Sequence, residues 1–492
     1  MRRFSIALLA LLALLCSATA WGADWPQFRG DNSNGVSPTK APVEFSPGRN
    51  ELWSAKLESG HSSPCIVGDV ILLTTFDAQR KELAVVCLDR RTGQTRWRRE
   101  VPADEIERGH PSFNPASSTP ASDGERVVAY FGSCGLFCYD LSGNVQWERR
   151  LPLTKSYAGN ATSPIITGDR VILYRGNYVD HFAWALDKRT GEELWKVQQS
   201  EKFSTDVACT ATPIVANGAV ILHSARAVQA LDLASGERVW RLRCATTATS
   251  TPILAGDEVI VATWNQTGEA SLTPTLPSFE KLLADRDRDG DKMIGGKEFP
   301  RLMIFHRSEG VEAPQNGAPL RFAYVDADKN GKINSAEWER WLQKDAQRRT
   351  RYTEHGLLAI PLKSAGEVSD DRIRRLAKEG IPEVPSPLHY RGRAYFVKNG
   401  GILTCIDLKT GNRDYRLRTR GRGTHYASPV IAGEHLYTAS GDGKISVIHL
   451  GDKGKIVAVN DMGDPVYATP AVVDGVIYVR THHTLYAFGV KR

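Results

Sequence analysis

The chain has 492 residues, of which 41% are hydrophobic and 24% charged, a composition that excludes disordered, collagen-like and polytopic membrane proteins. Its 63 Lys and Arg against 56 Asp and Glu give a net charge of +7, and because the basic residues are scattered, no nucleic-acid partner is expected. This length predicts about three domains or one large repeat architecture.

The first 20 residues have the features of a signal peptide. Arg2 and Arg3 precede an apolar run from Ile6 to Leu15, and the small residues Ala18-Thr19-Ala20 suit a signal peptidase. The run has about half of the roughly 20 apolar residues that a transmembrane helix needs, so no transmembrane anchor is expected. We therefore predict that the chain is exported and is periplasmic or extracellular.

A Ser/Thr-Pro doublet followed by a short apolar run, a turn and a second apolar run recurs along the chain. Proline cannot donate to a sheet ladder, which favours a place at the first residue of an innermost strand. The eight doublets are Ser63-Pro64, Thr119-Pro120, Ser163-Pro164, Thr212-Pro213, Thr251-Pro252, Ser386-Pro387, Ser428-Pro429 and Thr469-Pro470.

An Asp-x-x-Thr/Ser-Gly turn that leads to an aromatic residue follows most of these doublets, as in Asp187 to Trp195 and Asp407 to Tyr415. The spacing of about 45 to 50 residues fits a four-stranded propeller blade, in which the aromatic residue packs one blade against the next. We predict an all-β, eight-bladed β-propeller of four-stranded blades.

The last repeat, Thr469 to Gly489, contains three predicted strands and ends before its fourth. Glu51-Leu52-Trp53 copies Glu193-Leu194-Trp195 of a complete repeat. Residues 51–57 are therefore predicted to complete the eighth blade and close the ring.

Seven cysteines remain after the signal peptide, so at least one thiol is unpaired. Cys87, Cys138 and Cys405 occupy a repeat position where alanine stands in other repeats. This exchange predicts small buried core positions in preference to redox or metal chemistry.

Trp25-Pro26-Gln27-Phe28-Arg29-Gly30 and the Leu-Asp-x-x-Thr-Gly-x-x-x-Trp repeats resemble the PQQ-like β-propeller repeat family over about residues 24–267 and 356–489. The resemblance implies the propeller fold. The family includes dehydrogenases that use pyrroloquinoline quinone (PQQ) and the non-enzymatic assembly lipoprotein BamB, so the resemblance leaves the chemistry open.

Two twelve-residue acidic loops interrupt the fifth repeat, between Val259–Thr263 and Leu357–Pro361. Their spacing resembles a paired EF-hand, in which carboxylates, one backbone carbonyl and a closing Glu surround calcium. The predicted calcium ligands are Asp287, Asp289, Asp291, the carbonyl of Met293 and Glu298 in loop one, and Asp326, Asp328, Asn330, the carbonyl of Lys332 and Glu337 in loop two.

Loop one has Lys292 at the sixth position, where loop two has Gly331. A non-glycine residue in a left-handed turn costs roughly 1–2 kcal/mol, so loop one is expected to bind calcium more weakly. Since calcium is commonly abundant outside the cytoplasm, we expect it to be structural here.

Residues just before the innermost strands are predicted to surround one mouth of the channel: His61, Ser62, Asn114, Asn160, Asp206, Thr247, His425 and Tyr426. Asp206 and His425 could fill some of the roles that a PQQ enzyme requires and are weak catalytic candidates. The adjacent Cys-Cys pair that many quinoprotein alcohol dehydrogenases use is absent from the sequence, and a polar channel mouth is also what solvated loops produce.

The predicted organisation is a signal peptide (1–20), a first propeller part (21–267), a small all-α EF-hand pair (268–355) and a second propeller part (356–492). Residues 366–384 are ambiguous, because Asp371 to Leu376 fits either an outer strand or a short helix. The predicted function is an exported calcium-binding scaffold that binds a protein segment or a carbohydrate at the channel mouth. The alternatives are a PQQ-dependent dehydrogenase of an alcohol or sugar, and an insertion that docks a partner peptide between its helices.

Overall fold

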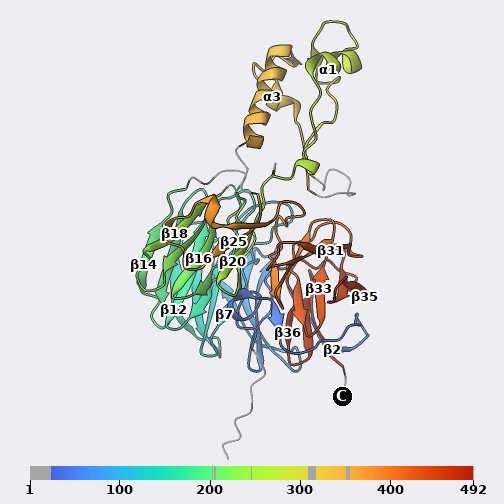
Figure 1. Cartoon of the computed structure of the whole chain (residues 1–492). Coiled ribbons are helices and arrows are strands. Elements are labelled where there is room, and N and C mark those ends of the chain that lie inside the picture. Colours follow the sequence, from blue (N-terminus) through green and yellow to red (C-terminus); the bar gives the residue numbers. More distant parts are fainter. Residues whose placement is uncertain are drawn as a thin grey trace, which may run out of the picture.

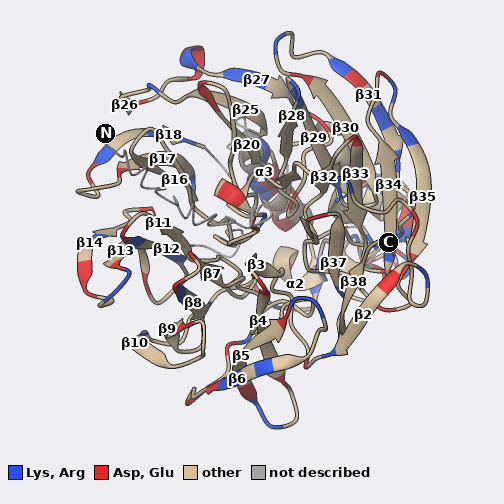
Figure 2. Cartoon of the chain, turned by 90° about the horizontal axis from the view of Figure 1, so that it is seen from below, with Lys and Arg blue, Asp and Glu red and all other residues tan. Residues whose placement is uncertain are grey.

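Eight β-sheets surround a central axis, and a helical insertion stands above one face of the resulting disc (Figures 1 and 2). The computed structural model describes residues 24–201, 203, 207–244, 246–266, 268–307, 317–350 and 355–490. The predicted signal peptide and Asp206 lie outside these residues. Lys and Arg outnumber Asp and Glu along the outer strands of the blades (Figure 2).

The first four blades follow one another along the chain, each an antiparallel sheet ordered from the axis outwards. Their strands are β3 (Cys65–Val67), β4 (Val70–Asp77), β5 (Glu82–Asp89) and β6 (Thr95–Val101); β7 (Ala121–Ser122), β8 (Arg126–Phe131), β9 (Gly135–Asp140) and β10 (Val145–Arg150); β11 (Ile165–Thr167), β12 (Arg170–Gly176), β13 (His181–Asp187) and β14 (Glu193–Gln198); β15 (Ile214–Ala216), β16 (Ala219–Ser224), β17 (Ala227–Asp232) and β18 (Arg238–Arg243).

The last four blades include the interrupted fifth and the closing eighth. Their strands are β19 (Ile253–Ala255), β20 (Glu258–Thr263), β25 (Gly356–Pro361) and β27 (Arg374–Ala377); β28 (Leu388–Tyr390), β29 (Arg393–Lys398), β30 (Ile402–Asp407) and β31 (Arg413–Arg418); β32 (Val430–Ala432), β33 (His435–Ala439), β34 (Lys444–His449) and β35 (Lys455–Asp461); β36 (Ala471–Val473), β37 (Val476–Arg480), β38 (Thr484–Phe488) and β2 (Glu51–Lys56).

The predicted fold and ring closure are confirmed. The strand β2 pairs with β38, with Trp53 opposite Ala487, so the beginning of the described chain completes the eighth blade. Each doublet immediately precedes an innermost strand, as proline requires.

Residues 366–384 contain both predicted forms, a 3₁₀ turn η3 (Asp370–Arg372) and the outer strand β27, while β26 (Gly366–Glu367) extends blade four.

The hydroxyl of each doublet joins neighbouring blades. It accepts the backbone N–H of the Ser or Thr in the preceding blade, and the eight bonds form a closed ring around the axis. The ring runs through Ser63, Thr119, Ser163, Thr212, Thr251, Ser386, Ser428 and Thr469 and back to Ser63, with donor–acceptor distances of 2.9–3.3 Å.

Tryptophans of the outer strands join the blades near the rim. The Trp53 indole N–H donates to the Arg90 carbonyl of the next blade at 3.0 Å, and Trp97, Trp147 and Trp195 donate in the same way. Gly93 has a φ of 72°, and a Cβ there would lie 2.4 Å from the Trp53 ring, so the turn requires glycine. This contact explains the Thr-Gly element of the repeat.

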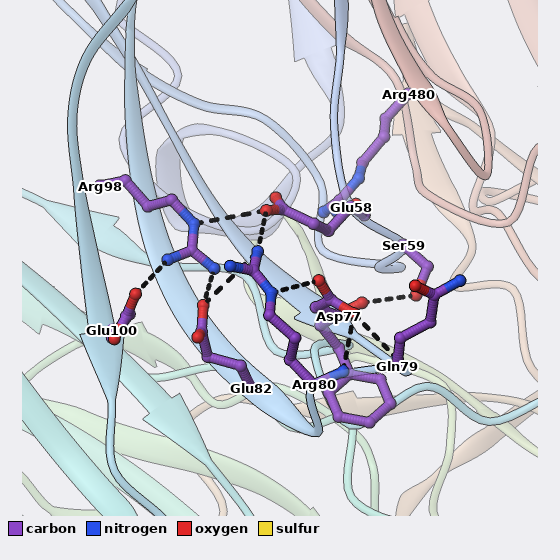
Figure 3. Close-up of polar contacts among 10 residues, drawn as sticks. Glu58, Ser59, Asp77, Gln79, Arg80, Glu82, Arg98, Glu100 and Arg480 are labelled. Atoms are coloured by element: carbon purple, nitrogen blue, oxygen red, sulfur yellow. Dashed lines mark hydrogen bonds and ion pairs between the residues drawn. The ribbon is translucent and has the colours of Figure 1, made fainter.

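The ring seam is reinforced by charged groups between the eighth and first blades. The fully buried Arg480 of β37 donates from Nη1 to the carbonyls of Ser62 and Thr74 at 3.1 and 2.9 Å. Glu58, which follows β2, lies 3.4 Å from Arg98 and 3.7 Å from Arg80 in the first blade (Figure 3). The closing strand is therefore anchored by polar contacts as well as by its ladder.

The segment from Trp25 to Ser37, which contains η1 (Asp31–Ser33) and β1 (Val36–Ser37), crosses the innermost strands of several blades. Trp25 pairs with Ile66, Asn32 bonds Val215 through its side-chain amide, and β1 runs parallel to β32. The segment thereby ties the first, fourth and seventh blades together.

All seven described cysteines are buried. Cys87 and Cys138 lie opposite Trp97 and Trp147 in their ladders, as Ala185 lies opposite Trp195, so the predicted packing role is confirmed. Burial raises the pKa of the Cys87 thiol to about 12, which keeps it protonated and unreactive at neutral pH.

Residues between β20 and β25 form the insertion seen above the disc (Figure 1). Its elements are η2 (Ala270–Leu272), α1 (Phe279–Arg286), β21 (Ile294–Gly295), β22 (Met303–His306), β23 (Gly317–Pro319), α2 (Phe322–Val325), β24 (Lys332–Ile333) and α3 (Ser335–Thr350). It is therefore not all-α as expected, because β21 pairs with β24 and β22 with β23. None of the helices in the described residues has the length and apolar character to span a bilayer.

The insertion is rooted in the propeller by a buried ion pair. Glu269, near the start of the insertion, lies 2.8 Å from the ammonium of Lys398 in blade six and accepts the Gly380 N–H at 3.0 Å. Both side chains of the ion pair are almost fully buried. Trp264 and Phe305 extend the shared core upwards, with ring centroids 6.2 Å apart.

Candidate functional site

Two acidic loops face one another in the insertion. Each follows a short helix, α1 or α2, and the backbone pairing of Ile294 with Ile333 joins their eighth positions. This pairing fixes the two loops side by side, so any ion held by one loop lies close to the other.

Loop two brings three of its predicted ligands together. Carboxylate oxygens of Asp326, Asp328 and Glu337 lie within 4.8 Å of one another, and Asp326 and Glu337 are buried. The Glu337 carboxylate accepts the Ala327 and Asn334 N–H groups at 2.9 and 3.1 Å, which fixes its orientation. A hard cation prefers such a set of oxygens.

Loop one has the same arrangement in a more exposed form. Oxygens of Asp287, Asp289 and Glu298 also lie within 4.8 Å of one another. Lys292 adopts a φ of 63°, the left-handed conformation that its position in the loop requires. The predicted strain at this residue is therefore present.

A lysine of loop two contacts loop one. The Lys332 ammonium forms a close ion pair with Asp291 and lies 3.9 Å from Asp289. Its backbone N–H donates to Asn330 Oδ1 at 2.8 Å, which keeps the residue within loop two. Lys332 thus places a positive charge among the predicted ligands of the neighbouring loop.

The second candidate site is the channel. A cavity of about 210 Å³ is lined by all eight doublet hydroxyls, and Phe28 of the N-terminal segment also lines it. The aromatic, histidine and charged side chains of its wall are His61, His110, Phe113, Tyr157, Trp264, Arg307, Glu383, Tyr426 and Tyr467.

Arg307 comes from the insertion, directly after β22, and reaches the propeller. Its Nε lies 3.1 Å from Glu383 Oε2. The Glu383 carboxylate raises the pKa of Arg307 and outweighs the opposing effect of burial, with smaller contributions from Tyr157 and Tyr426, so the guanidinium stays charged. Burial raises the pKa of Glu383, and Arg307 opposes that shift.

The predicted channel residues divide into two groups. His61, Thr247 and Tyr426 line the cavity. Ser62, Asn114, Asn160 and His425 are buried and are not among its lining residues. The His425 backbone N–H donates to Asn399 Oδ1 at 2.8 Å. Asp206 lies outside the described residues.

Sequence reasoning missed His110, Tyr157, Arg307, Glu383 and Tyr467. Tyr467 stands two residues before the doublet Thr469-Pro470, a spacing that could have identified it. Arg307 carries no such signal, because its position depends on how the insertion folds back over the channel.

The described cavity residues do not fit PQQ, which has three carboxylates. Among them Arg307 is the one lysine or arginine, and it is paired with Glu383. Burial lowers the pKa of His61 to about 3, with Arg480 and His482 adding to the shift, so His61 is neutral at pH 7. Glu383 is likewise the one described carboxylate in the wall and is engaged by Arg307.

Comparison with known proteins agrees with this architecture. Residues 81–275 match the family model described as outer membrane protein assembly factor BamB. No curated protein sequence matches the chain.

Solved structures with similar propellers include enzymes and a non-enzyme. BamB from Moraxella catarrhalis is 13% identical with a TM-score of 0.53, over 90% of this chain and 98% of BamB. The quinohemoprotein alcohol dehydrogenase ADHIIG from Pseudomonas putida HK5 is 14% identical with a TM-score of 0.55, over 96% of this chain and 81% of the enzyme. A europium-containing methanol dehydrogenase is 12% identical with a TM-score of 0.54, over 95% of this chain and 98% of the enzyme chain. At these identities the likeness concerns the fold alone.

Proposed function

We propose that this chain is an exported, calcium-binding PQQ-like propeller that acts as a binding or assembly scaffold. The observation that carries the proposal is the paired acidic loops, whose buried Glu337 and Asp326 are already held by backbone N–H groups. A preformed set of oxygens needs little reorganisation to take up a hard cation.

The role of calcium is structural in this proposal. The ions would compensate the clustered carboxylates of the insertion, which shares its core with the fifth and sixth blades. Removing calcium with a chelator should lower the melting temperature and raise hydrogen exchange in residues 271–353, while the propeller strands remain protected. Unchanged exchange in the insertion would contradict a structural role.

The scaffold role rests on the channel mouth, where partly buried aromatic side chains and the Arg307–Glu383 pair line the cavity. The similarity to a BamB family model supports a protein that works by binding, and a protein segment or a carbohydrate is the proposed ligand. Export rests on residues 1–20; N-terminal sequencing of the mature protein from its native host should begin after Ala20.

The rival function is a PQQ-dependent dehydrogenase of an alcohol or sugar. It is tested by incubating the full chain with PQQ and calcium and measuring dye-linked oxidation of alcohols and aldoses. We expect no turnover. Turnover that is lost in Asp206→Ala would replace the scaffold with an enzyme.

A further inference from the structure

The floor of the cavity is a ring of hydroxyl groups with unused hydrogen-bonding capacity. Each of the eight doublet hydroxyls accepts one backbone N–H, and among the described residues none of them donates a hydrogen bond. A hydroxyl carries one donor and two acceptor positions. Eight O–H donors therefore remain for whatever occupies the channel.

The wall of the cavity adds two groups of aromatic rings. Tyr467 contacts His61 and Tyr426, with ring centroids 5.0 and 5.8 Å away. His110 and Tyr157 form a second pair, with ring centroids 5.7 Å apart. Such rings present an apolar face together with a polar edge.

The roof is supplied by the insertion. The Arg307 guanidinium lies beside Glu383, which precedes the sixth blade, and it lines the cavity together with Tyr157 and Tyr426, which precede the third and seventh blades. One side chain from the insertion therefore connects separate sectors of the mouth. A guanidinium and a carboxylate together offer fixed donors and acceptors to a ligand.

The formal charge of the described wall is balanced. Arg307 and Glu383 neutralise one another, and the other wall groups are hydroxyls, an amide, aromatic rings and small apolar side chains. A multiply charged ligand would leave charges uncompensated in a partly buried site. An uncharged ligand with many hydroxyl groups and apolar C–H faces matches both the hydroxyl floor and the aromatic walls.

We propose that the channel mouth binds an uncharged saccharide, and that Arg307 positions it from the roof. This inference names the ligand of the scaffold proposed above and rests on that role. A ring of a neutral sugar would stack on Tyr467 and donate and accept hydrogen bonds at the doublet hydroxyls.

The test is calorimetric titration of the calcium-loaded full chain with neutral trisaccharides: maltotriose, cellotriose, mannotriose and N,N′,N″-triacetylchitotriose. Trigalacturonate serves as the charged counterpart. Variants are Arg307→Ala, Tyr467→Leu and Tyr467→Phe, with Arg189→Ala as a control, since Arg189 is exposed in a turn of blade three away from the cavity. Melting curves verify that each variant is folded.

At least one neutral trisaccharide should bind, and trigalacturonate should bind at least about tenfold more weakly. Arg307→Ala and Tyr467→Leu should each raise its Kd by about tenfold, the size of a lost hydrogen bond to a charged group or of lost stacking. Tyr467→Phe and Arg189→Ala should stay within about threefold of the parent, since the stacking face is kept.

The saccharide proposal fails if no neutral trisaccharide binds, or if binding is unaffected by Arg307→Ala and Tyr467→Leu. It also fails if an extended peptide that was selected for binding to the full chain no longer binds to these two variants. That result would assign the channel mouth to a protein segment. Calcium titration of the same samples separates the two proposals. If calcium gives heat of binding and no saccharide does, the saccharide proposal is rejected and the proposed calcium-binding scaffold stands.

Discussion

The backbone N–H of Thr469 donates to Ser63 Oγ at 3.1 Å, across 406 positions of the sequence. This bond joins the last doublet to the first and completes the ring of eight. The same eight residues that join the blades also line the cavity.

Replacing Ser63 by Ala should destabilise the fold. The substitution leaves the buried Thr469 N–H without its acceptor, at a cost of about 1–3 kcal/mol in the free energy of unfolding. Urea unfolding followed by tryptophan fluorescence measures the change. The control Ser54→Ala removes an exposed hydroxyl of β2 and should change stability by less than about 0.5 kcal/mol; equal effects would deny the ring a stabilising role.

The closing strand makes a separate prediction. Deleting residues 24–57 removes β2 and exposes the edge of β38, so the truncated chain should aggregate or fail to fold. Trp53→Phe loses the bond to Arg90 O and part of the indole that packs on Gly93, and it should cost about 1–2 kcal/mol, whereas Trp53→Ala loses the whole ring and should cost about 3 kcal/mol or more. A well-folded truncated chain with an unchanged melting temperature would contradict the ring closure.

The position of Lys332 predicts that the two acidic loops differ in calcium affinity. Replacing it by Met removes the ammonium that pairs with Asp291 and keeps the backbone carbonyl of loop two. The weaker of two calcium affinities should then rise by at least about threefold, because a competing positive charge is gone. Lys329→Met, an exposed neighbour, is the matched control. The same gain in both variants would indicate a general charge effect.

Glu107 predicts a fall in stability as the pH rises. Burial raises the pKa of this carboxyl from 4.5 to about 7, and neither oxygen accepts a well-formed hydrogen bond among the described residues. The unfolded chain ionises first, so the stabilising contribution is complete below about pH 4.5 and is lost between there and about pH 7. The loss is on the order of 3 kcal/mol.

Glu107→Gln mimics the protonated form and should remove this part of the pH dependence. Between pH 5 and pH 8, the free energy of unfolding measured in urea should fall less for the variant than for the parent chain, by the part that Glu107 contributes. At pH 8 the variant should therefore be more stable than the parent chain. Glu105→Gln, at an exposed neighbouring residue, is the control. Parallel pH profiles for Glu107→Gln and the parent chain would contradict the assignment.

Local chemistry made the blades predictable. Proline at the start of each innermost strand, the Thr-Gly turn and the outer tryptophan act within one repeat or on its neighbour, so their spacing identifies the blades and the closing strand. The interruption between Thr263 and Leu357 was visible because a helical pattern with acidic loops broke the repeat.

The lining of the cavity was less predictable because it depends on distant segments of the chain. The ring hydroxyls act on the next blade, and the ring itself exists only once the chain has closed. Arg307 reaches Tyr157 and Glu383 only through the fold of the insertion. Conversely, His425 had the right position in the repeat but turns into the blade end, where Asn399 holds it.

The most direct test is calorimetric titration of the chelator-treated full chain with calcium. Two binding events are predicted; the tighter should disappear in Glu337→Gln, the weaker in Glu298→Gln, and both should persist in Glu339→Gln, which alters an exposed neighbour. Absence of calcium heats in the parent chain, or heats unaffected by Glu337→Gln, would contradict the account.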